Sequence, residues 1–361
     1  MNSSNPKVLL FLKTTPMKRR SFLKSTLALS TLSVLPNNLS ADKQVNTPEA
    51  EQVTTLRPAR LSKGDTVAIM GMAGAMRDPK ILSGFIQIME KQGFNVRVGQ
   101  TVNKTFGYLS GSDDDRADEF NDFVSNPSIK AILFVKGGWG CGRVLDKINY
   151  DQLKKNPKII LGFSDMTSLL NAIYQETGLI TFHGPVGNSS WEKFTLNSFQ
   201  EIVCRGGDSF QKPELPQLQS FSTWQSGEVI GELIGGNLTV FCSLLGTPYW
   251  PSCTGKILFL EETHEEPYRI DRMLNSLRLA GVFDQVSGVV FGQFNACNAE
   301  NPQESFTLEE VVRQQLNGYS FPIIWGAPIG HVKDKWTVPI GTQVRLNAQE
   351  LSLKLMHPAV S

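Results

Sequence analysis

Short apolar runs alternate with longer segments of mixed polarity through the first half of this chain. The apolar runs predict strands at 66–70, 95–99, 131–135 and up to Leu161. The segments that alternate with them predict helices at 79–92, 113–124 and 168–175. An alternation of strands and helices is typical of α/β proteins, so the sequence predicts an α/β layer with a mostly parallel sheet.

A polar segment rich in proline and glutamine, from about Pro213 to Thr223, ends this pattern and is the best candidate for a linker. Further apolar segments follow it at 230–233, 256–260, 286–291 and 323–325. We therefore expect an N-terminal α/β domain over 59–212, a linker over 213–227 and a C-terminal domain over 228–361.

The start of the chain has the pattern of an export signal. The basic run Lys18-Arg19-Arg20-Ser21-Phe22-Leu23-Lys24 precedes a mildly apolar stretch over 25–35. That stretch is too short to cross a membrane as an ordinary helix. Paired arginines followed by Phe-Leu-Lys are typical of a twin-arginine signal, although a basic, solvated tail is the alternative interpretation.

We interpret residues 1–41 as this signal, with cleavage after Ala41, and residues 42–58 as a polar linker. Met17 lies just before the basic run and is an alternative start of the protein. A twin-arginine signal predicts a periplasmic or otherwise exported protein without a stable membrane anchor.

Composition excludes several functions. The formal net charge of the 361 residues is +1, so nothing indicates a nucleic-acid partner. The five cysteines are an odd number, which leaves at least one unpaired in an exported protein. No paired-cysteine or His-Glu-x-x-His spacing indicates a metal site, and we expect neither a metal nor a cofactor.

The most informative local pattern is Gly162-Phe163-Ser164-Asp165, directly after the apolar run 159–161. A strand that ends in such a turn before a helix lifts a serine hydroxyl out of the sheet. It also leaves a neighbouring backbone N–H free to meet negative charge. The same residues are typical of a helix start that Ser164 or Asp165 caps. These four residues alone do not decide between a serine nucleophile and a helix cap.

A serine nucleophile that uses an imidazole base has few partners in this chain, because only His183, His264, His331 and His357 are present. His357 lies in the C-terminal tail and His264 in a run of glutamates. His183 ends a predicted strand, and His331 lies in a loop with proline and glycine that suits a rigid imidazole. Taken singly, each histidine fits a structural role better than a catalytic one.

The glycine-rich run Lys136-Gly137-Gly138-Trp139-Gly140-Cys141-Gly142-Arg143 follows the predicted strand 131–135. It lacks the Gly-Lys-Ser/Thr ending of a phosphate-binding loop and the spacing of a dinucleotide fold. We expect a tight turn whose backbone N–H groups point into a cleft. Cys141 also raises the alternative of a thiol nucleophile.

Six motifs follow one another in a fixed order, from the glycine-rich run to Pro328-Ile329-Gly330-His331. Between these two come Gly162–Asp165, Gly235–Leu238, Leu258–Glu262 and Pro267–Leu274. This order resembles the LD-carboxypeptidase family of serine peptidases, which includes murein tetrapeptide carboxypeptidases and microcin C self-immunity peptidases. The resemblance extends from about Leu61 to about Pro358. It implies a second domain that is strand-rich and partly barrel-like, beside an N-terminal domain that carries the nucleophile.

The resemblance also implies a Ser-His-Glu triad. Ser164 would be the nucleophile, His331 the base and Glu261 the residue that orients the imidazole. Glu262 is the alternative to Glu261, and a strand turns only one of the two toward His331. The backbone N–H groups of Gly138 and Asp165 would form the oxyanion hole.

By resemblance, the substrate is a small murein tetrapeptide whose bond between an L-centre diamino acid and terminal D-alanine is cleaved. A carboxypeptidase must bind a free carboxylate, which arginine does well. The substrate-binding candidates are Arg143, Arg269 and Arg272 for this carboxylate, with Trp139, Tyr268 and Asn237 beside them. Each of the three arginines has a structural ion pair as its alternative role.

Two other functions stay open at this point. A microcin C immunity-type peptidase would cleave an acyl-sulfamoyl or peptidyl-nucleotide amide, although export argues against an intracellular detoxifier. An exported, non-catalytic binding protein with two lobes would have no common geometry among Ser164, Glu261 and His331. Members of the family are often dimers, which leaves the choice between a monomer and a homodimer open.

Overall fold

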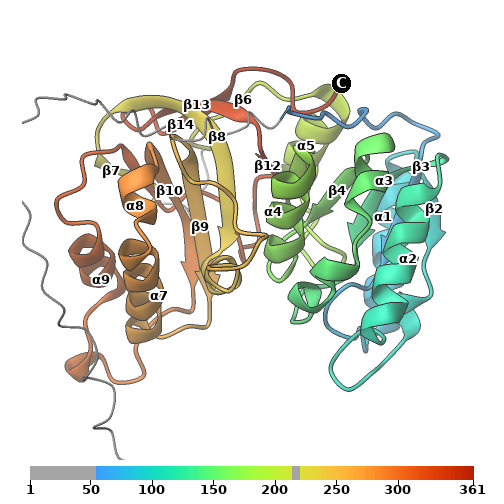
Figure 1. The fold of residues 1–361 in the computed structure, drawn as a ribbon, viewed down its shortest axis with the longest axis horizontal. Helices are drawn as coiled ribbons and strands as arrows, with labels where there is room; N and C mark the ends of the chain where they lie inside the picture. The colour runs from blue at the N-terminus through green and yellow to red at the C-terminus, as the bar shows by residue number, and fades with distance from the viewer. Residues whose placement is uncertain (1–53, 214–219) are drawn as a thin grey trace, which may run out of the picture. The chain divides into compact units, whose positions relative to one another are not determined.

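Two β-sheets organise the computed structural model, which describes residues 54–213 and 220–361 (Figure 1). These residues belong to one compact unit. The predicted signal at 1–41 lies outside the described residues, as do most of the predicted linker 42–58 and residues 214–219 of the predicted linker 213–227. Within the described ranges, no helix is long and apolar enough to cross a membrane.

The first sheet has six strands in the order β12-β5-β4-β3-β1-β2. They are β1 (Thr66–Met70), β2 (Asn95–Val98), β3 (Ile129–Phe134), β4 (Ile159–Gly162), β5 (Thr181–His183) and β12 (Val338–Ile340). All neighbours are parallel except β12, which is antiparallel to β5. Every residue of β4 is buried, as expected for an apolar strand covered on both faces of a parallel sheet. The mostly parallel sheet predicted from the sequence is confirmed.

Helices pack around the first sheet (Figure 1). They are α1 (Pro79–Lys91), η1 (Thr101–Asn103), α2 (Asp113–Ser125), η2 (Cys141–Lys147), α3 (Tyr150–Lys155), α4 (Met166–Thr177) and α5 (Lys193–Arg205). The predicted helices at 79–92, 113–124 and 168–175 correspond to α1, α2 and α4. A capping box begins α2, because Ser112 Oγ accepts a hydrogen bond from the Asp115 N–H and the Asp115 carboxylate accepts one from the Ser112 N–H.

The second sheet has eight strands in the order β6-β14-β13-β8-β9-β10-β11-β7 and curls into a half-barrel. They are β6 (Ser209–Phe210), β7 (Ser222–Gln225), β8 (Glu228–Asn237), β9 (Ile257–Thr263), β10 (Gly288–Asn295), β11 (Ile323–Trp325), β13 (Gln343–Asn347) and β14 (Ser352–Leu355). The four strands from β8 to β11 are parallel, and the others pair antiparallel. The predicted strand-rich, partly barrel-like region is confirmed.

The remaining helices accompany the second sheet, and α7, α8 and α9 lie together on one side of it (Figure 1). The elements are α6 (Leu238–Cys242), α7 (Pro267–Leu279), α8 (Val282–Gln285), η4 (Pro302–Glu304) and α9 (Leu308–Gln315). Helix α7 buries Ile270 and Leu274 among its apolar residues and leaves Tyr268 and Arg269 exposed. Its polar face therefore carries two of the residues that the sequence analysis selected as substrate-binding candidates.

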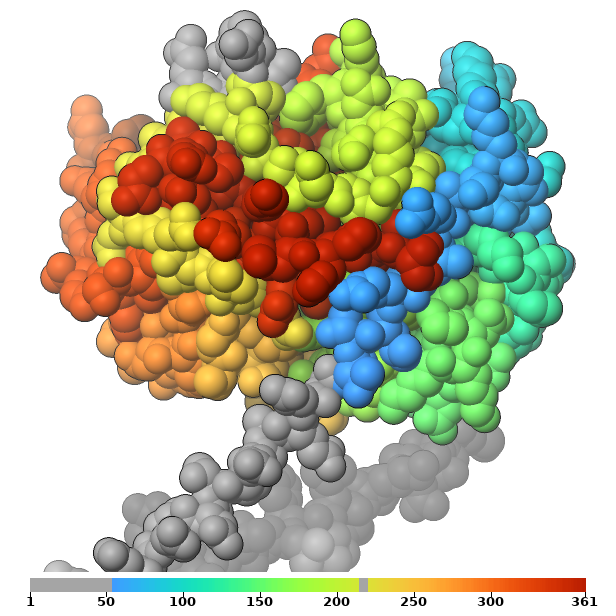
Figure 2. Space-filling view, turned by 90° about the horizontal axis from the view of Figure 1, so that it is seen from above, coloured from blue at the N-terminus to red at the C-terminus, as the bar shows by residue number. Residues whose placement is uncertain are grey.

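The C-terminal segment connects the two sheets. Strand β12 lies within the C-terminal region predicted at 228–361, yet it adds an edge to the first sheet beside β5. Figure 2 shows this segment running across the molecule to the start of the described chain. There the Ser361 N–H donates to the Pro58 carbonyl at 2.9 Å, and the Arg60 N–H donates to the Ser361 carbonyl at 3.1 Å. The last residues of the chain thus hold the first described ones.

Candidate active site

The turn after β4 presents Ser164 in an unusual backbone conformation. Ser164 has a φ of 64°, in the left-handed region that residues other than glycine rarely adopt. Gly162 is needed before it, because a Cβ there would lie 2.6 Å from Met166 Cγ and 2.8 Å from Phe134 Cδ2. The capping interpretation fails for Asp165, which occupies the N-cap position of α4 without a side-chain capping bond.

His331 connects the two sheets at this turn. Its Nε2 lies 3.0 Å from Ser164 Oγ, and its Nδ1 lies 2.8 Å from Glu261 Oε2. An ionised carboxylate only accepts hydrogen bonds, so Nδ1 carries the proton and Nε2 accepts from the serine hydroxyl. The non-catalytic alternative predicted no common geometry among these three residues, but they form one hydrogen-bonded chain.

Gly330 makes this approach of His331 and Glu261 possible. It has a φ of 108°, and a Cβ on it would lie 2.3 Å from Glu261 Oε2. Any larger residue would both strain the backbone and displace the carboxylate.

The Glu261 side chain is fully buried at the end of β9. Burial opposes its ionisation, but the imidazoles of His183 and His331 outweigh this effect and lower the pKa of Glu261 to about 2. His183 Nε2 lies 3.9 Å from Glu261 Oε1, beyond hydrogen-bond distance. Burial lowers the pKa of His183 itself, which favours a neutral imidazole.

Glu262 points away from His331. Its carboxylate accepts hydrogen bonds from Asn237 Nδ2 at 2.8 Å, from Thr239 Oγ1 at 2.7 Å and from the backbone N–H groups of Thr239 and Thr263, each at 2.8 Å. Burial raises the pKa of Glu262 in spite of these donors. The structure thus brings Glu261 to the imidazole and uses Glu262 to hold the start of α6.

The glycine-rich turn lies against the serine. A Cβ on Gly137 would be 3.0 Å from Ser164 Cβ, and Gly138 has a φ of 124°. Within the described part of the chain, neither the Gly138 N–H nor the Asp165 N–H donates a hydrogen bond to a protein acceptor. Two free backbone donors beside a serine hydroxyl are the arrangement that an oxyanion hole requires.

Cys141 does not have the surroundings of a nucleophile. It is fully buried, and burial is the main cause that raises the pKa of its thiol well above the usual value. Its Sγ contacts the Met72 carbonyl at 3.8 Å and Met166 Sδ at 3.4 Å. The thiol alternative is therefore disfavoured by the structure.

The substrate-binding candidates have different surroundings. Arg143 is held by Asp113 through its Nε and Nη2, and the latter distance is 2.8 Å. Arg269 lies over the ring of Tyr268, at 5.7 Å from the centroid, and 3.6 Å from a Glu265 oxygen. The remaining candidates are Trp139 and Tyr268, both about half exposed, Arg272 on α7, and Asn237, which caps α6.

Lys335 is a charged residue near the site that the sequence analysis missed. It is only 4% exposed, and its Nζ lies 4.3 Å from the centre of the Phe163 ring. The Phe163 ring in turn packs against the His331 ring, with centroids 4.7 Å apart. Burial is the main cause that lowers the pKa of Lys335 to about 8. Its position four residues after His331 was the available signal in the sequence.

Among the described residues, no group of three or more His, Cys, Asp or Glu side chains could hold a metal ion. The hydrogen-bonded Ser164, His331 and Glu261 side chains are the groups that this arrangement provides for chemistry. A serine hydroxyl bonded to an oriented, neutral imidazole can be deprotonated as it attacks a carbonyl carbon.

Comparison with known proteins gives matches to two family models. They are described as the N-terminal domain of LD-carboxypeptidase, which matches residues 67–184, and its C-terminal domain, which matches residues 230–346. A probable murein peptide carboxypeptidase of Bacillus subtilis is 35% identical over 302 residues, covering 81% of this chain and 92% of that protein.

Two further proteins are similar in sequence and structure. The microcin C7 self-immunity protein MccF of Escherichia coli is 29% identical over 337 residues, covering 85% of this chain and 97% of that protein. A structure of MccF in complex with glutamyl sulfamoyl guanosine has a TM-score of 0.78 at 27% identity, covering 85% of this chain and 100% of that one. A muramoyltetrapeptide carboxypeptidase from Oxalobacter formigenes has a TM-score of 0.70 at 26% identity, covering 80% of this chain and 97% of that one.

Proposed function

This chain belongs to the LD-carboxypeptidase family, and on that basis we propose that it is a serine carboxypeptidase that removes terminal D-alanine from murein tetrapeptides. The bond it cleaves joins D-alanine to the L-centre of a diamino acid. Relatives whose names include murein peptide and muramoyltetrapeptide carboxypeptidase support this substrate class. The observation that carries the proposal is the pair of hydrogen bonds that His331 makes, at 3.0 Å to Ser164 and at 2.8 Å to Glu261.

In the first step, Ser164 Oγ attacks the scissile carbonyl carbon while His331 Nε2 takes the hydroxyl proton. His331 then holds a positive charge, which the ionised Glu261 carboxylate stabilises through the Nδ1–H bond. The backbone N–H groups of Gly138 and Asp165 receive the negative charge that develops on the carbonyl oxygen. Each such donor contributes about 2.7–4 kcal/mol to transition-state stabilisation in a comparable serine enzyme.

In the second step, the His331 imidazolium gives its proton to the amine of the departing D-alanine, and an acyl-enzyme remains on Ser164. The neutral imidazole then takes a proton from water, whose oxygen attacks the acyl carbon, and Ser164 recovers its proton as the tripeptide leaves. The His331 side chain is 22% exposed, which leaves a path for this water from solvent.

The substrate carboxylate needs a cation within reach of the serine. Arg143 binds Asp113 closely with two of its nitrogens, whereas the ion pair of Arg269 with Glu265 is longer, at 3.6 Å. Arg269 and Arg272 on α7 are therefore the better candidates. Trp139 and Tyr268 are exposed to solvent at 49% and 53%, so either ring is free to pack against a bound peptide.

We propose further that the enzyme is exported through its twin-arginine signal and works in the periplasm or an equivalent outer compartment. The support is the paired arginines at 19 and 20 with the mildly apolar stretch 25–35, all outside the described residues. A homodimer is a second proposal, carried over from the family resemblance alone. Sedimentation of the mature protein tests it directly.

The decisive experiment is incubation of the mature protein with free murein tetrapeptide, with mass spectrometry to detect D-alanine and the tripeptide. Release that disappears in Ser164→Ala supports the proposal. If a fluorophosphonate modifies Ser164 but the protein leaves the tetrapeptide intact, the proposed substrate is contradicted.

The second candidate is a microcin-immunity type of peptidase, which the TM-score of 0.78 with MccF favours. The structure of MccF with glutamyl sulfamoyl guanosine suggests the comparison substrate for this alternative. An acyl sulfamoyl nucleoside should therefore be assayed beside the tetrapeptide. A kcat/KM for the nucleoside that exceeds that for the tetrapeptide would move the assignment to this second type.

A further inference from the structure

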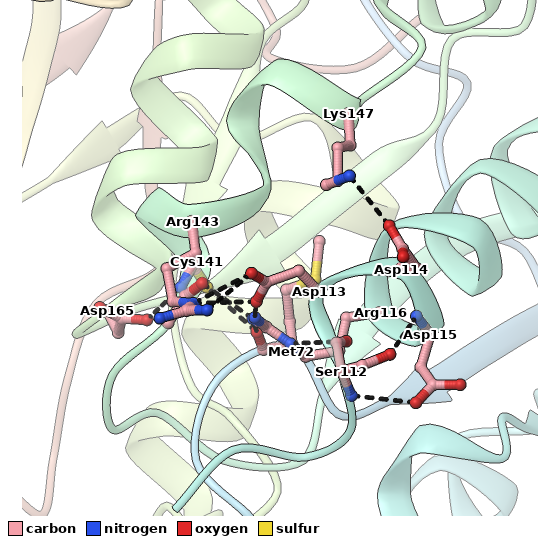
Figure 3. A network of polar contacts seen from close by, with 11 residues as sticks. Met72, Ser112, Asp113, Asp114, Asp115, Arg116, Cys141, Arg143, Lys147 and Asp165 are labelled. Carbon is pink, nitrogen blue, oxygen red and sulfur yellow. Dashed lines mark hydrogen bonds and ion pairs between the residues drawn. The ribbon is translucent and has the colours of Figure 1, made fainter. Parts of the chain in front are cut away.

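The peptide unit between Gly140 and Cys141 is held at both of its polar ends (Figure 3). The Gly140 carbonyl accepts a hydrogen bond from Arg116 Nη1 at 2.8 Å, and the Cys141 N–H donates to Asp165 Oδ2 at 2.7 Å. One end meets a guanidinium and the other a carboxylate, so both bonds are charge-assisted. Rotation of this peptide plane would break both bonds at once.

Arg116 is itself fixed in place. It comes from α2, is fully buried, and also donates from Nη1 to the Met72 carbonyl at 2.6 Å. Its Nη2 forms an ion pair with Asp113, and Arg143 binds the same carboxylate (Figure 3). A buried guanidinium needs such partners, because an unpaired charge inside a protein is costly. Arg116 therefore ties the segment after β1 to the glycine-rich turn.

The Asp165 side chain is buried for a reason other than helix capping. It is 1% exposed, and its Oδ1 has no hydrogen-bond partner among the described residues. The bond from Oδ2 goes to Cys141 and not to the first turn of α4. A buried carboxylate with one unpartnered oxygen weakens the fold. Its placement therefore calls for a functional explanation.

We call the peptide unit between Gly140 and Cys141, with its bonds to Arg116 and Asp165, the clamped peptide. It begins two residues after Gly138, whose N–H is a proposed oxyanion donor. Gly138 and Gly140 have φ values of 124° and 130°, so the turn between them uses conformations that other residues rarely adopt. The same turn passes Ser164 closely, as the 3.0 Å approach of a Gly137 Cβ to Ser164 Cβ indicates. A small rotation of the turn would shift the Gly138 N–H relative to the serine.

We propose that Arg116 and the side chain of Asp165 are positioning residues that hold the Gly138 N–H in line with Ser164. Asp165 then serves both halves of the oxyanion hole. Its backbone N–H is one donor, and its carboxylate holds the turn that carries the other. This inference rests on the proposed serine-peptidase function.

The test compares Asp165→Ala with Asp165→Asn, which keeps an oxygen that can accept from the Cys141 N–H. Asp165→Ala should lower kcat about 10²-fold, the typical cost of displacing a catalytic group by about 1 Å, with little change in KM. Asp165→Asn should recover most of this loss. The rate at which a fluorophosphonate modifies Ser164 should fall in parallel, because that reaction also builds negative charge on an oxygen at the serine.

Lys147→Met is the matched control. Lys147 lies on η2, close in sequence to the clamped peptide, and pairs with Asp114 at 2.9 Å on the surface (Figure 3). Removing this ion pair should leave kcat and the labelling rate unchanged, since it touches neither Gly140 nor Cys141. A drop as large as that of Asp165→Ala would show that any disturbance of η2 matters, and it would overturn the proposal.

Arg116 supplies a second arm of the test. Arg116→Lys keeps a cation but cannot bridge the Met72 and Gly140 carbonyls as a guanidinium does. Combined with Asp165→Ala, it should cost less than the product of the two single losses, because both act on one peptide plane. Independent, multiplicative losses overturn the proposal. So does an Asp165→Ala protein with a lower melting temperature but unchanged kcat and labelling rate.

The two readouts separate this inference from the proposed function. If the wild-type protein is labelled at Ser164 but releases no D-alanine, the substrate assignment fails. The labelling rates of the variants still test whether Arg116 and Asp165 position the Gly138 N–H. A wild-type protein that is neither labelled nor active overturns both.

Discussion

Replacing Glu261 with glutamine removes one negative charge from beside His331 while keeping the shape of the side chain. In the wild-type protein, the carboxylate accepts the Nδ1–H bond at 2.8 Å and is fully buried. The pKa of Glu261 is lowered to about 2 by the neighbouring imidazoles, against the effect of burial, so the group is ionised throughout the neutral range. The substitution therefore changes the charge at every pH at which the enzyme is assayed.

The magnitude of the effect follows from this geometry. A hydrogen bond of this length places the carboxylate and imidazolium charges about 4 Å apart, which corresponds to about 4 kcal/mol at an effective dielectric constant of about 20. That energy stabilises the transition state, in which His331 is charged, and equals about 10³-fold in rate. A glutamine NH₂ can also donate to Nδ1, which puts the proton on Nε2, the wrong nitrogen. The comparable change in a serine protease costs about 10⁴-fold. We expect a loss of about 10³- to 10⁴-fold in kcat.

Glu262→Gln is the control, because it makes the same chemical change at the next residue. Glu262 accepts three hydrogen bonds from the start of α6 and one from the Thr263 N–H, and it does not contact His331. Its replacement should cost about 1–3 kcal/mol of stability through mismatched donors. The D-alanine release rate of the folded protein should change by less than about tenfold.

The assay is single-turnover D-alanine release measured by mass spectrometry, with urea unfolding to establish that each variant is folded. The reverse ranking of the two variants would refute the reasoning and move the orienting role to Glu262. Equal activity of Glu261→Gln and wild type would refute the charge argument altogether.

Four further outcomes are expected. Ser164→Ala should abolish D-alanine release with the fold intact, and activity within about tenfold of wild type would exclude Ser164 as nucleophile. Excess EDTA should leave the rate unchanged, whereas a loss that zinc restores would contradict a serine mechanism. Burial lowers the pKa of Lys335 to about 8 from 10.5, so the folded protein loses this proton first and stability should rise by up to about 3 kcal/mol as pH increases from 8 to 10.5. Lys335→Met should lack this rise in urea unfolding at two pH values, and an identical rise would exclude Lys335 as its source. Replacing Arg19 and Arg20 together with lysine should leave active, folded enzyme in the cytoplasm, and normal export on cell fractionation would rule out the twin-arginine signal.

Much of the fold could be predicted because its signals are local. The amphipathic segment at 79–92 and the polar helix start at 113 lie within about a residue of α1 and α2. Hydrophobic spacing and capping residues act over a few positions, so they can be read along the chain. The turn that carries Ser164 was also visible, because a strand, a glycine and a serine are adjacent in sequence. What the pattern left open there was whether Asp165 caps the helix.

Other features depended on contacts between distant segments. Strand β12 lies more than 150 residues after β5, and nothing in its three residues indicates which sheet edge it completes. Strand alternation predicted that Glu261 and Glu262 face opposite sides but not which side meets His331. That choice depends on the curl of the second sheet and on the backbone of Gly330, which brings His331 and Glu261 into contact.

The amino-acid sequence by itself determined the order of elements, the family resemblance and the candidate serine, because these rest on short runs of neighbouring residues. The tertiary structure alone decided which side chains meet. It brought the Asp165 carboxylate to Cys141 instead of to its own helix, and it buried Arg116 against the Gly140 carbonyl. The physical reason is that hydrogen bonds between distant segments form only where packing of the sheets and loops has already set the distance between them.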